Sequence, residues 1–417
     1  MTDLGKNSCS FSPRNRGIAL LACAMLATAS FAAAARDLTI GVVYAPDDPR
    51  YETKRLERSF PGHPLGRPRV GAEVALAESS FQLSGASLRV ALQDVPFDDT
   101  AAAKTRILAM VQKGVRHFLL DLPGPDIADL SKALQTADVL LFNVSAPDDN
   151  LRRAACSANL FHTLADESMM ADATAQFLTA HKWTRVLLLS NTDAVNVSRV
   201  AAARQSIKRY GIKLSGDKIF KLSNDPRERE LGNVALLTAG SDADAVWVVD
   251  GDGEFARDVP YRTSLPRPVV GSAGLVAEAW QTSWERYGAP QLSRRFKQTA
   301  GRSMAGADWA AWIATKAIID VAIKSPDARE HRRALRSPDL VLDGFKGVRL
   351  SFRSWDQQLR QPLFLAHGGI GGGVAGVAPF DGFLHPSNNL DTLGADQRES
   401  PCKLDDKLSD GSFGGKK

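Results

Sequence analysis

Acidic, amide and hydroxyl side chains follow the predicted strands of this chain at the points where the strands end. In open parallel sheets the ligand crevice lies at this edge, because the connecting loops meet there. The sequence therefore predicts a ligand site in these loops, and several carboxylates facing one cleft would attract a cationic ligand. Aspartate also favours turns and helix N-caps, so each residue alone also fits a capping role. The candidate site residues are Tyr44, Asp47, Asp94, Asp121, Asn143, Ser145, Asn191, Asp193, Asp250 and Asp252.

A hard metal ion is a sharper version of this hypothesis. Calcium-sized ions take about six to eight oxygen ligands, and a lanthanide ion would want the same carboxylates. The run from Asp250 to Glu254 is not an EF-hand, because Phe255 replaces the glycine of the loop and Tyr261 replaces its final glutamate. If a cation binds, the predicted ligands are Asp47, Asp94, Asp121 and Asp250.

The sequence shows no pattern of a catalytic centre. It has no His-Glu-x-x-His, no Cys-x-x-Cys and no Walker A motif. The segment 301–305 approaches a nucleophile elbow but lacks the closing glycine. The segment 371–376 matches G-x-G-x-x-G in letters only, because Pro379 follows too soon for a helix. We therefore expect a binding protein without a cofactor rather than an enzyme.

The N-terminus reads as a secretory signal peptide. Arg14 and Arg16 supply the positive region, an apolar run covers Ile18–Ser30, and small residues follow up to Ala35. The apolar run is shorter than the roughly 20 residues that span a bilayer. We expect export to the periplasm and release after cleavage. Acylation at Cys23 stays open as an alternative, since the residues before it loosely match a lipoprotein signal.

Charge and cysteine content agree with an exported binding protein. The formal net charge of +5 over 417 residues is small, and it falls further without the leader. It gives no reason to expect nucleic acid or an anionic membrane as partner. Two of the four cysteines, Cys156 and Cys402, remain after cleavage. An oxidising compartment allows them to form one disulfide, and two unpaired thiols are the alternative.

Short apolar runs alternate with longer amphipathic segments, which predicts parallel βαβ units. The pattern runs through once and then restarts after residue 163, so we expect two doubly wound α/β lobes. Expected strands are 38–43, 88–92, 117–121, 139–144, 185–190, 213–220, 245–250, 268–271 and 348–352. Expected helices are 70–81, 101–114, 126–135, 166–181, 197–210, 227–239, 275–287 and 308–323. Tyr44 and Tyr51 are expected to line the cleft, whereas the spacing of Trp280, Trp284, Trp309 and Trp312 predicts core packing.

The layout resembles the type I periplasmic solute-binding proteins of the branched-chain amino acid class. A narrower set of motifs resembles the subfamily associated with pyrroloquinoline quinone (PQQ)-dependent alcohol oxidation systems. Those motifs are Cys156–Thr163, Asp308–Trp312, Phe345–Gly347, Ser351–Asp356, Gln358–Pro362 and Leu390–Gly394.

The resemblance implies a fold of two Rossmann-like lobes joined by a multi-stranded hinge. Residues 1–35 would be the leader, 36–155 the first part of lobe 1, 156–288 lobe 2, 289–366 the return to lobe 1 with the hinge, and 367–417 a Gly-rich loop and tail. Such a protein closes on a small solute and delivers it to an inner-membrane ABC permease, here in connection with quinoprotein alcohol dehydrogenases. A cation receptor and an accessory or sensor protein for the dehydrogenase are the alternatives.

One position departs from the family pattern. Amino acid binders of this class hold the ligand carboxylate with hydroxyls and backbone groups after the third and fourth strands. Here those places read Asp121–Pro125 and Asn143–Pro147. A carboxylate at Asp121 would repel the α-carboxylate of an amino acid, which disfavours an amino acid ligand.

Overall fold

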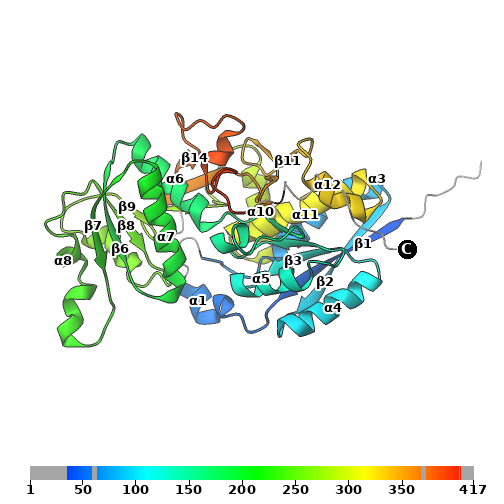
Figure 1. Ribbon diagram of the computed structural model, residues 1–417, viewed down its shortest axis with the longest axis horizontal. Coiled ribbons are helices and arrows are strands. Elements are labelled where there is room, and N and C mark those ends of the chain that lie inside the picture. Colours follow the sequence, from blue (N-terminus) through cyan, green and yellow to red (C-terminus); the bar gives the residue numbers. More distant parts are fainter. Residues whose placement is uncertain (1–34, 59–62, 368–371, 403, 405–417) are drawn as a thin grey trace, which may run out of the picture.

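The structure of the protein is a computed structural model that describes residues 35–58, 63–367, 372–402 and 404. The leader before Ala35, with Cys23, lies outside these residues, as do 368–371 of the Gly-rich loop and 405–417 of the tail. The signal peptide and the acylation alternative therefore stay predictions. The described chain forms two lobes that lie side by side, each built around one sheet (Figure 1).

Lobe 1 contains a five-stranded parallel sheet in the order β2-β1-β3-β4-β5. Its central strands β3 and β4 are entirely buried, as expected for a sheet covered on both faces. The strands are β1 (Arg36–Tyr44), β2 (Leu88–Pro96), β3 (His117–Asp121), β4 (Leu140–Asn143) and β5 (Leu160–His162). The helices of this lobe are α1 (Thr53–Arg58), α2 (Arg69–Glu78), α3 (Ser80–Gly85), α4 (Thr100–Gln112), α5 (Gly124–Ala133), α10 (Ala289–Ala300), α11 (Gly306–Lys324) and α12 (His331–Leu335).

Helix α11 is the main buried helix of lobe 1. Trp309 and Trp312 lie on it in the core, and Trp280 is buried beside them, which confirms the packing predicted from their spacing. Trp284 is partly buried against the same core. The close approach of α2 to α11 requires glycine at position 71, because a Cβ there would lie 2.1 Å from the carbonyl oxygen of Asp308.

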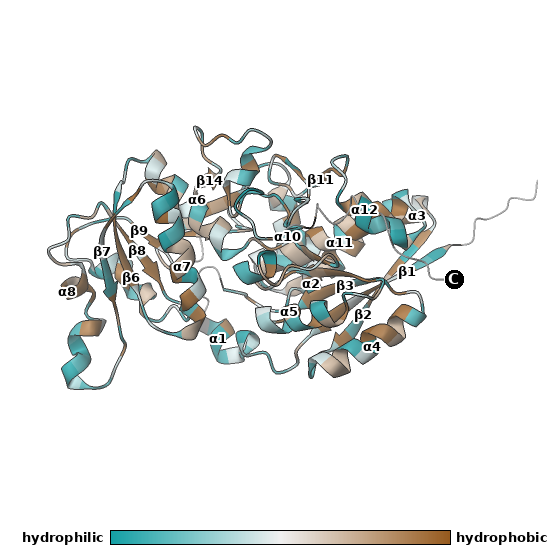
Figure 2. Cartoon of the chain, in the orientation of Figure 1, coloured by the Kyte–Doolittle hydropathy of each residue, from teal (hydrophilic) through white to brown (hydrophobic). Residues whose placement is uncertain are grey.

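Lobe 2 contains a seven-stranded mixed sheet in the order β14-β13-β10-β9-β8-β6-β7. Its outer strands β13 and β14 are antiparallel to their neighbours. The strands are β6 (Arg185–Ser190), β7 (Lys213–Ile219), β8 (Ala245–Val249), β9 (Val269–Gly271), β10 (Leu275–Glu278), β13 (Leu363–His367) and β14 (Val374–Ala378). The helices are α6 (Glu167–Ala180), α7 (Ala194–Arg209), α8 (Val234–Thr238) and α9 (Val259–Arg262). Figure 2 shows that hydrophobic residues concentrate on the strands of both sheets.

Three sequence-based expectations about elements are wrong. The predicted helix 275–287 begins as strand β10, because a short apolar run fits either structure and β13, its partner, lies far along the chain. The predicted helix 227–239 is a 3-10 helix, Pro226–Gly232, followed by α8, since the side chain of Asn233 accepts from Leu236 N and starts a new helix. The predicted strand 348–352 pairs only at β12 (Arg349–Leu350), with β11 (Leu342–Asp343).

The segments assigned from the sequence to the return to lobe 1 and to the tail supply β13 and β14. Both strands pair with the sheet of lobe 2, through antiparallel contacts that periodicity cannot reveal. Part of the expected Gly-rich loop is therefore a strand. Within the described residues, no helix has the length and apolar character needed to span a bilayer.

Candidate functional site

The carboxyl ends of β1, β3 and β4 bring polar side chains together around one buried carboxylate, Asp121. Tyr51 donates its hydroxyl hydrogen to Asp121 Oδ1 at 2.6 Å, and Arg67 Nη1 donates to Oδ2 at 3.2 Å. Arg50 Nη2 reaches Oδ1 at 3.4 Å. We call the group formed by Asp48, Arg50, Tyr51, Arg67, Asp121 and Ser145 the Asp121 cluster.

Arg50 joins the loop after β1 to the loop after β4. Its Nη1 donates to the carbonyl oxygen of Ser145 at 3.1 Å and to Ser145 Oγ at 3.2 Å. Its Nη2 lies 2.6 Å from Asp48 Oδ2. Asp48 also accepts from Arg50 N and caps the short 3-10 helix Pro49–Tyr51 that presents the arginine. The local turn therefore fixes the guanidinium over the end of β4.

Arg67 completes the cluster from the segment just before α2. Its Nη2 donates to the carbonyl oxygens of Ala45 at 2.6 Å and Pro46 at 3.0 Å. Its guanidinium lies 4.5 Å from the ring centre of Tyr51 and 5.2 Å from that of Tyr44, within the range of cation–π attraction. Tyr44, which the sequence places at this site, is therefore a wall of the cluster.

The charges of the Asp121 cluster are balanced. Burial raises the pKa of Asp121, while Arg50, Tyr51 and Arg67 oppose that rise. Burial lowers the pKa of Arg50, but its hydrogen bond to Asp48 and the nearby acidic groups outweigh this effect and raise it overall. Burial and the charge of Asp121 also raise the pKa of Tyr51 well above 10, so the hydroxyl stays protonated.

This balance corrects the argument against an amino acid ligand. That argument treated Asp121 as a free negative charge. The structure shows two guanidinium groups and a phenol on its oxygens, so its field at a ligand carboxylate is largely cancelled. Sequence reasoning missed Arg50 and Arg67 because the search followed carboxylates at strand ends. The segment between the first strand and the first long helix holds four arginines, and nothing in the sequence singles out Arg50 and Arg67 among them.

The remaining candidates of lobe 1 lie apart from this cluster or serve the turn itself. Asn143 is buried, donates to the carbonyl oxygen of Ala146 at 2.8 Å and holds the turn after β4. Asp94 accepts from Arg69 Nε at 2.7 Å near the end of β2. Asp47 is exposed. Among the candidates after β4, only Ser145 belongs to the Asp121 cluster, because it accepts from Arg50.

In lobe 2 the candidates form two smaller groups at the ends of β6 and β8. Asn191 Oδ1 accepts from Asp193 N at 3.2 Å, at the start of α7. Asp250 is buried and accepts from Ala256 N at 2.8 Å, while its other oxygen has no hydrogen-bond partner within the described residues. Burial and the neighbouring Asp252 raise the pKa of Asp250 to about 6. Asp252 itself is exposed.

The segment around His63 connects the edges of the two lobes electrostatically. Burial lowers the pKa of His63 to about 4, helped by the charges of Arg199 in α7 and Arg55 in α1. Asp252, after β8, opposes this shift. The pKa of His63, in lobe 1, therefore depends on charges of lobe 2, in α7 and after β8. Figure 1 likewise places α1 beside the lower end of α7, between the lobes.

The acidic residues do not form a metal centre. Among the residues that the structure describes, no group of three or more His, Cys, Asp or Glu side chains is placed to hold a metal ion. Asp121 faces two arginines, and Asp94 pairs with another arginine. The collective placement that suggested a hard cation is thus absent from these ranges.

The six motifs that carry the family resemblance contact one another near the segments that connect the two lobes. Gln361 donates to the carbonyl oxygen of Thr163 at 2.8 Å, and it accepts from Lys346 Nζ at 2.8 Å. Lys346 Nζ lies 3.6 Å from the ring centre of Trp309, and burial lowers its pKa well below 10.5. These contacts link four of the motifs in a buried chain.

The other two motifs, Ser351–Asp356 and Leu390–Gly394, join Gln358–Pro362 in a network of buried ion pairs. Arg353 Nε donates to Asp391 Oδ1 at 3.0 Å, and Arg360 Nε donates to the same oxygen at 2.8 Å. Arg353 Nη1 lies 3.6 Å from Asp356 Oδ2. We call Arg353, Asp356, Arg360 and Asp391 the hinge cluster.

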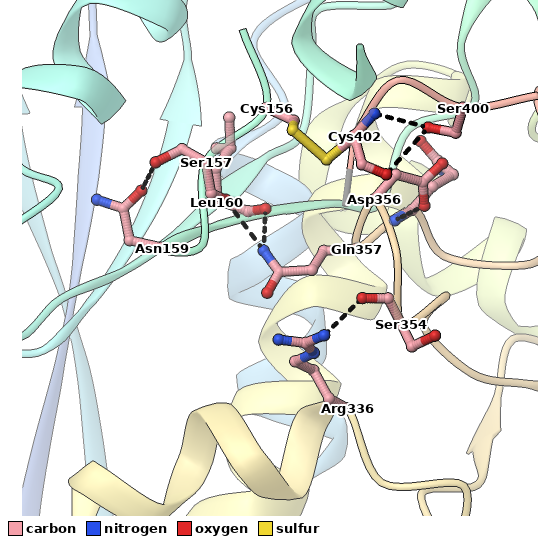
Figure 3. Close-up of a disulfide and its surroundings, with 11 residues drawn as sticks. Cys156, Ser157, Asn159, Leu160, Arg336, Ser354, Asp356, Gln357, Ser400 and Cys402 are labelled. Carbon is pink, nitrogen blue, oxygen red and sulfur yellow. Dashed lines mark hydrogen bonds between the residues drawn. A yellow bond between two sulfur atoms is a disulfide. The ribbon is translucent and has the colours of Figure 1, made fainter. Parts of the chain in front are cut away.

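A disulfide between Cys156 and Cys402 lies beside the hinge cluster, with an S–S distance of 2.11 Å and a Cα–Cα distance of 6.0 Å. Figure 3 shows it next to Asp356, Gln357 and Ser400. Cys156 lies in the loop before β5, and Gln357 donates to the carbonyl oxygen of Leu160 in that strand at 2.6 Å. The bridge therefore joins the C-terminal segment to the edge of lobe 1.

Comparison with known proteins shows that this architecture resembles that of periplasmic binding proteins. The family model described as periplasmic binding protein matches residues 74–257. A branched-chain amino acid ABC transporter periplasmic ligand-binding protein from Burkholderia xenovorans superposes with a TM-score of 0.66 at 13% identity, over 88% of this chain and 100% of that chain. No curated protein matches the sequence.

Two further solved structures are complexes. The solute-binding protein of an ABC transporter from R. palustris, bound to benzoate, has a TM-score of 0.60 at 13% identity, over 88% of this chain and 100% of that chain. A branched-chain amino acid transporter substrate-binding protein from Streptococcus pneumoniae, bound to isoleucine, has a TM-score of 0.59 at 16% identity, over 82% of this chain and 99% of that chain. The fold is that of the type I periplasmic binding proteins.

Proposed function

We propose that this protein is the substrate-binding component of an ABC importer and holds a small solute between its two lobes. The observation that supports this most strongly is the extent of the structural likeness. The ABC transporter binding proteins from B. xenovorans, R. palustris and S. pneumoniae are covered over 99–100% of their own length. A chain that keeps both lobes and all their connections keeps the architecture that lets such proteins close on a ligand.

The proposed ligand is a small organic molecule with a carboxylate. Isoleucine and benzoate, the ligands of two structural neighbours, share that group. The side chains of Arg50 and Arg67 lie at the carboxyl ends of β1, β3 and β4, and they are 23% and 29% exposed. Arginine recognises carboxylates well because its planar fork matches their geometry. Tyr44, Asp121 and Ser145 would then form the ligand wall on lobe 1.

Lobe 2 would contribute hydrogen-bond acceptors. Asn191 and Asp193 lie at the start of α7, and Asp250 and Asp252 follow β8. The buried oxygen of Asp250 that has no partner in the described residues suits a donor group on the ligand. A solute that contacts both lobes favours the closed arrangement over the open one, by as much as its affinity for the two states differs.

The motifs at the hinge connect this proposal to PQQ-dependent alcohol oxidation. The leader read from the sequence would place the protein in the periplasm, and an alcohol-derived carboxylic acid is a ligand of the proposed class. An inner-membrane permease is the proposed partner, and a quinoprotein dehydrogenase system supplies the context. A receptor for calcium or a lanthanide ion receives no support from the described residues, because they contain no group that could hold the metal.

The experiment that tests the proposal is a ligand screen on the full-length protein as exported from its own cells. Native mass spectrometry would identify retained cargo, and calorimetry would measure binding of amino acids, aromatic acids and short-chain acids. Calcium and lanthanum chloride would be titrated into metal-stripped protein in parallel.

We expect one class of carboxylate to bind with micromolar or tighter affinity and Arg67→Gln to weaken it. Arg69→Gln, an arginine that pairs with Asp94 on the same lobe, is the matched control and should bind normally. Absence of binding by every acid, together with co-purification with a dehydrogenase instead of a permease, would contradict the proposal and favour an accessory role.

A further inference from the structure

Three peptide segments of the described chain cross between the lobes. The first leads from β5 to α6, the second from β10 to α10, and the third enters β13. Such crossings form the hinge about which two lobes can rotate. After β14 the chain leaves the sheet of lobe 2 and continues to Cys402. We call the described residues 389–402 and 404 the C-terminal strap.

The C-terminal strap is attached to lobe 2 through the helices α6 and α7. Tyr210 donates its hydroxyl hydrogen to the carbonyl oxygen of Thr392 at 2.6 Å. Gly394 N donates to Asp172 Oδ2 at 2.8 Å, and Arg209 Nη1 donates to the carbonyl oxygen of Gly394 at 2.7 Å. Arg209 also forms an ion pair with Asp172, whose side chain is 2% exposed. Two of these three hydrogen bonds involve a charged side chain, and the bond from Gly394 N to Asp172 is buried.

The same strap is attached to lobe 1 through the segment 351–361. That segment belongs to lobe 1, since Phe352 packs edge-on against Phe161 of β5 with ring centres 5.1 Å apart. Asp391 of the strap accepts from Arg353 and from Arg360. Arg353 also donates to the carbonyl oxygens of Leu390 and Leu393.

The end of the strap is fixed covalently to lobe 1. Cys402 is bonded to Cys156 in the loop before β5, across 246 positions of the sequence (Figure 3). Leu404 N donates to the carbonyl oxygen of Trp355 at 3.2 Å. The covalent path thus leaves lobe 2 at β14 and returns to lobe 1 through the disulfide.

We infer that the C-terminal strap is a fourth connection between the lobes and limits how far they separate. If the lobes rotated apart by a large angle, the strap would be pulled from α6 and α7 or from Arg353, because its two attachments belong to different lobes. The first movement would break the hydrogen bonds that Thr392 and Gly394 make with Tyr210, Arg209 and Asp172. The second would separate the buried Asp391 from Arg353 and Arg360. The inference rests on the proposed function only in assuming that the lobes open to admit a ligand, because the contacts of the strap do not depend on any ligand.

The test measures the distance between the lobes in the ligand-free, full-length protein. Spin labels would be attached through non-natural residues at Gln112 in α4 and Ala201 in α7, both exposed. Added cysteines are avoided because they would compete for the disulfide. Pulsed electron paramagnetic resonance then gives the distribution of distances between the two labels for the parent protein and for the double variant Cys156→Ser/Cys402→Ser.

We expect a single narrow distribution for the parent and a broader one, extending to longer distances, for the double variant. Arg106→Gln, which removes a surface ion pair with Asp98 in lobe 1, is the control and should leave the parent distribution unchanged. The parent before and after dithiothreitol provides a second measurement that does not require the variant to fold.

An unchanged distribution after reduction, in protein whose circular dichroism is unchanged, would overturn the inference. The outcome is separate from the ligand screen, since the distances are recorded without ligand. A strap that limits opening in a protein that binds no acid would overturn the proposed function alone.

Discussion

The Asp121 cluster and the hinge cluster are both built from arginine–aspartate pairs, but they differ in their access to water. In the Asp121 cluster the side chains of Arg50 and Arg67 are 23% and 29% exposed. In the hinge cluster the side chain of Arg353 is fully buried, and that of Asp391 is 1% exposed. A partly exposed arginine can exchange its partner for water or a ligand, whereas a fully buried one cannot. The first arrangement suits binding, and the second suits a permanent connection.

This difference shows what the sequence motifs encode. The distinctive motifs lie almost entirely at the hinge and the strap, where Lys346, Gln361 and Arg353 are buried. The arginines that face the proposed ligand lie outside every motif, in the loops between β1 and α2. The motifs from which the alcohol-oxidation subfamily was predicted therefore concern how the lobes are joined. The identity of the ligand has to be found from the loops.

The largest expected difference between the two clusters is in their contribution to stability, and Arg353 is the residue at which to test it. We expect Arg353→Met to lower the free energy of unfolding by about 3–5 kcal/mol, because Asp356 would be left buried without its ion-pair partner and Asp391 would keep only Arg360. Urea unfolding followed by circular dichroism measures the loss. The matched variant Arg50→Met also removes a cation from two buried carboxylates, Asp48 and Asp121, but Arg50 itself is 23% exposed, so water can replace it and the loss should be smaller, about 1–3 kcal/mol. Equal losses at the two positions would show that burial does not separate the two clusters.

Removal of the disulfide is the next largest expected effect. Cys402→Ser should lower the free energy of unfolding by about 2–5 kcal/mol, since the bridge closes a loop of 246 positions and constrains the unfolded chain. Thermal unfolding with and without dithiothreitol measures this. The reductant should destabilise the parent protein and leave the serine variant unaffected. A parent that is insensitive to complete reduction would contradict the prediction.

At the Asp121 cluster we expect the effect to appear in binding. Once the ligand is identified, Arg67→Gln should weaken its binding by about 1.5–3 kcal/mol, the usual worth of a hydrogen bond to a charged group. Stability should change by about 1 kcal/mol or less, because the arginine is partly exposed. Calorimetry and urea unfolding of the same preparation separate the two quantities. A large stability loss with unchanged affinity would make the cluster structural.

Most of the architecture could be predicted from the sequence, because buried parallel strands such as β4 and β8 consist mainly of apolar residues. Strand β10 could not, since its antiparallel partner β13 follows about 85 residues later and its own apolar run fits a helix equally well. The site was predicted only in part. Asp121 and Ser145 follow from the positions of strand ends. Arg50 and Arg67 depend on how a loop folds, and no periodicity records that.

The smallest effect that we expect is a change in the stability of the protein with pH, which comes from Asp356 in the hinge cluster. Burial raises the pKa of Asp356 to about 6, against the opposing charge of Arg353, whereas an unfolded aspartate titrates near 3.9. Between about pH 4 and pH 6, Asp356 therefore carries a proton in the folded state and has lost it in the unfolded state. This contribution to stability is fully present below about pH 4 and is lost as pH rises through 6.

Asp356→Asn removes that contribution and keeps the shape of the protonated acid. The stability of the variant relative to the parent should therefore improve by about 1 kcal/mol between pH 5 and pH 8. Taking the difference between the two proteins cancels the buried histidines, whose lowered pKa values act in the opposite direction at acidic pH. The exposed Asp37, which pairs with Arg89, provides the control, and Asp37→Asn should show no such trend. If both variants responded alike, the raised pKa of Asp356 would not reflect its burial at the hinge.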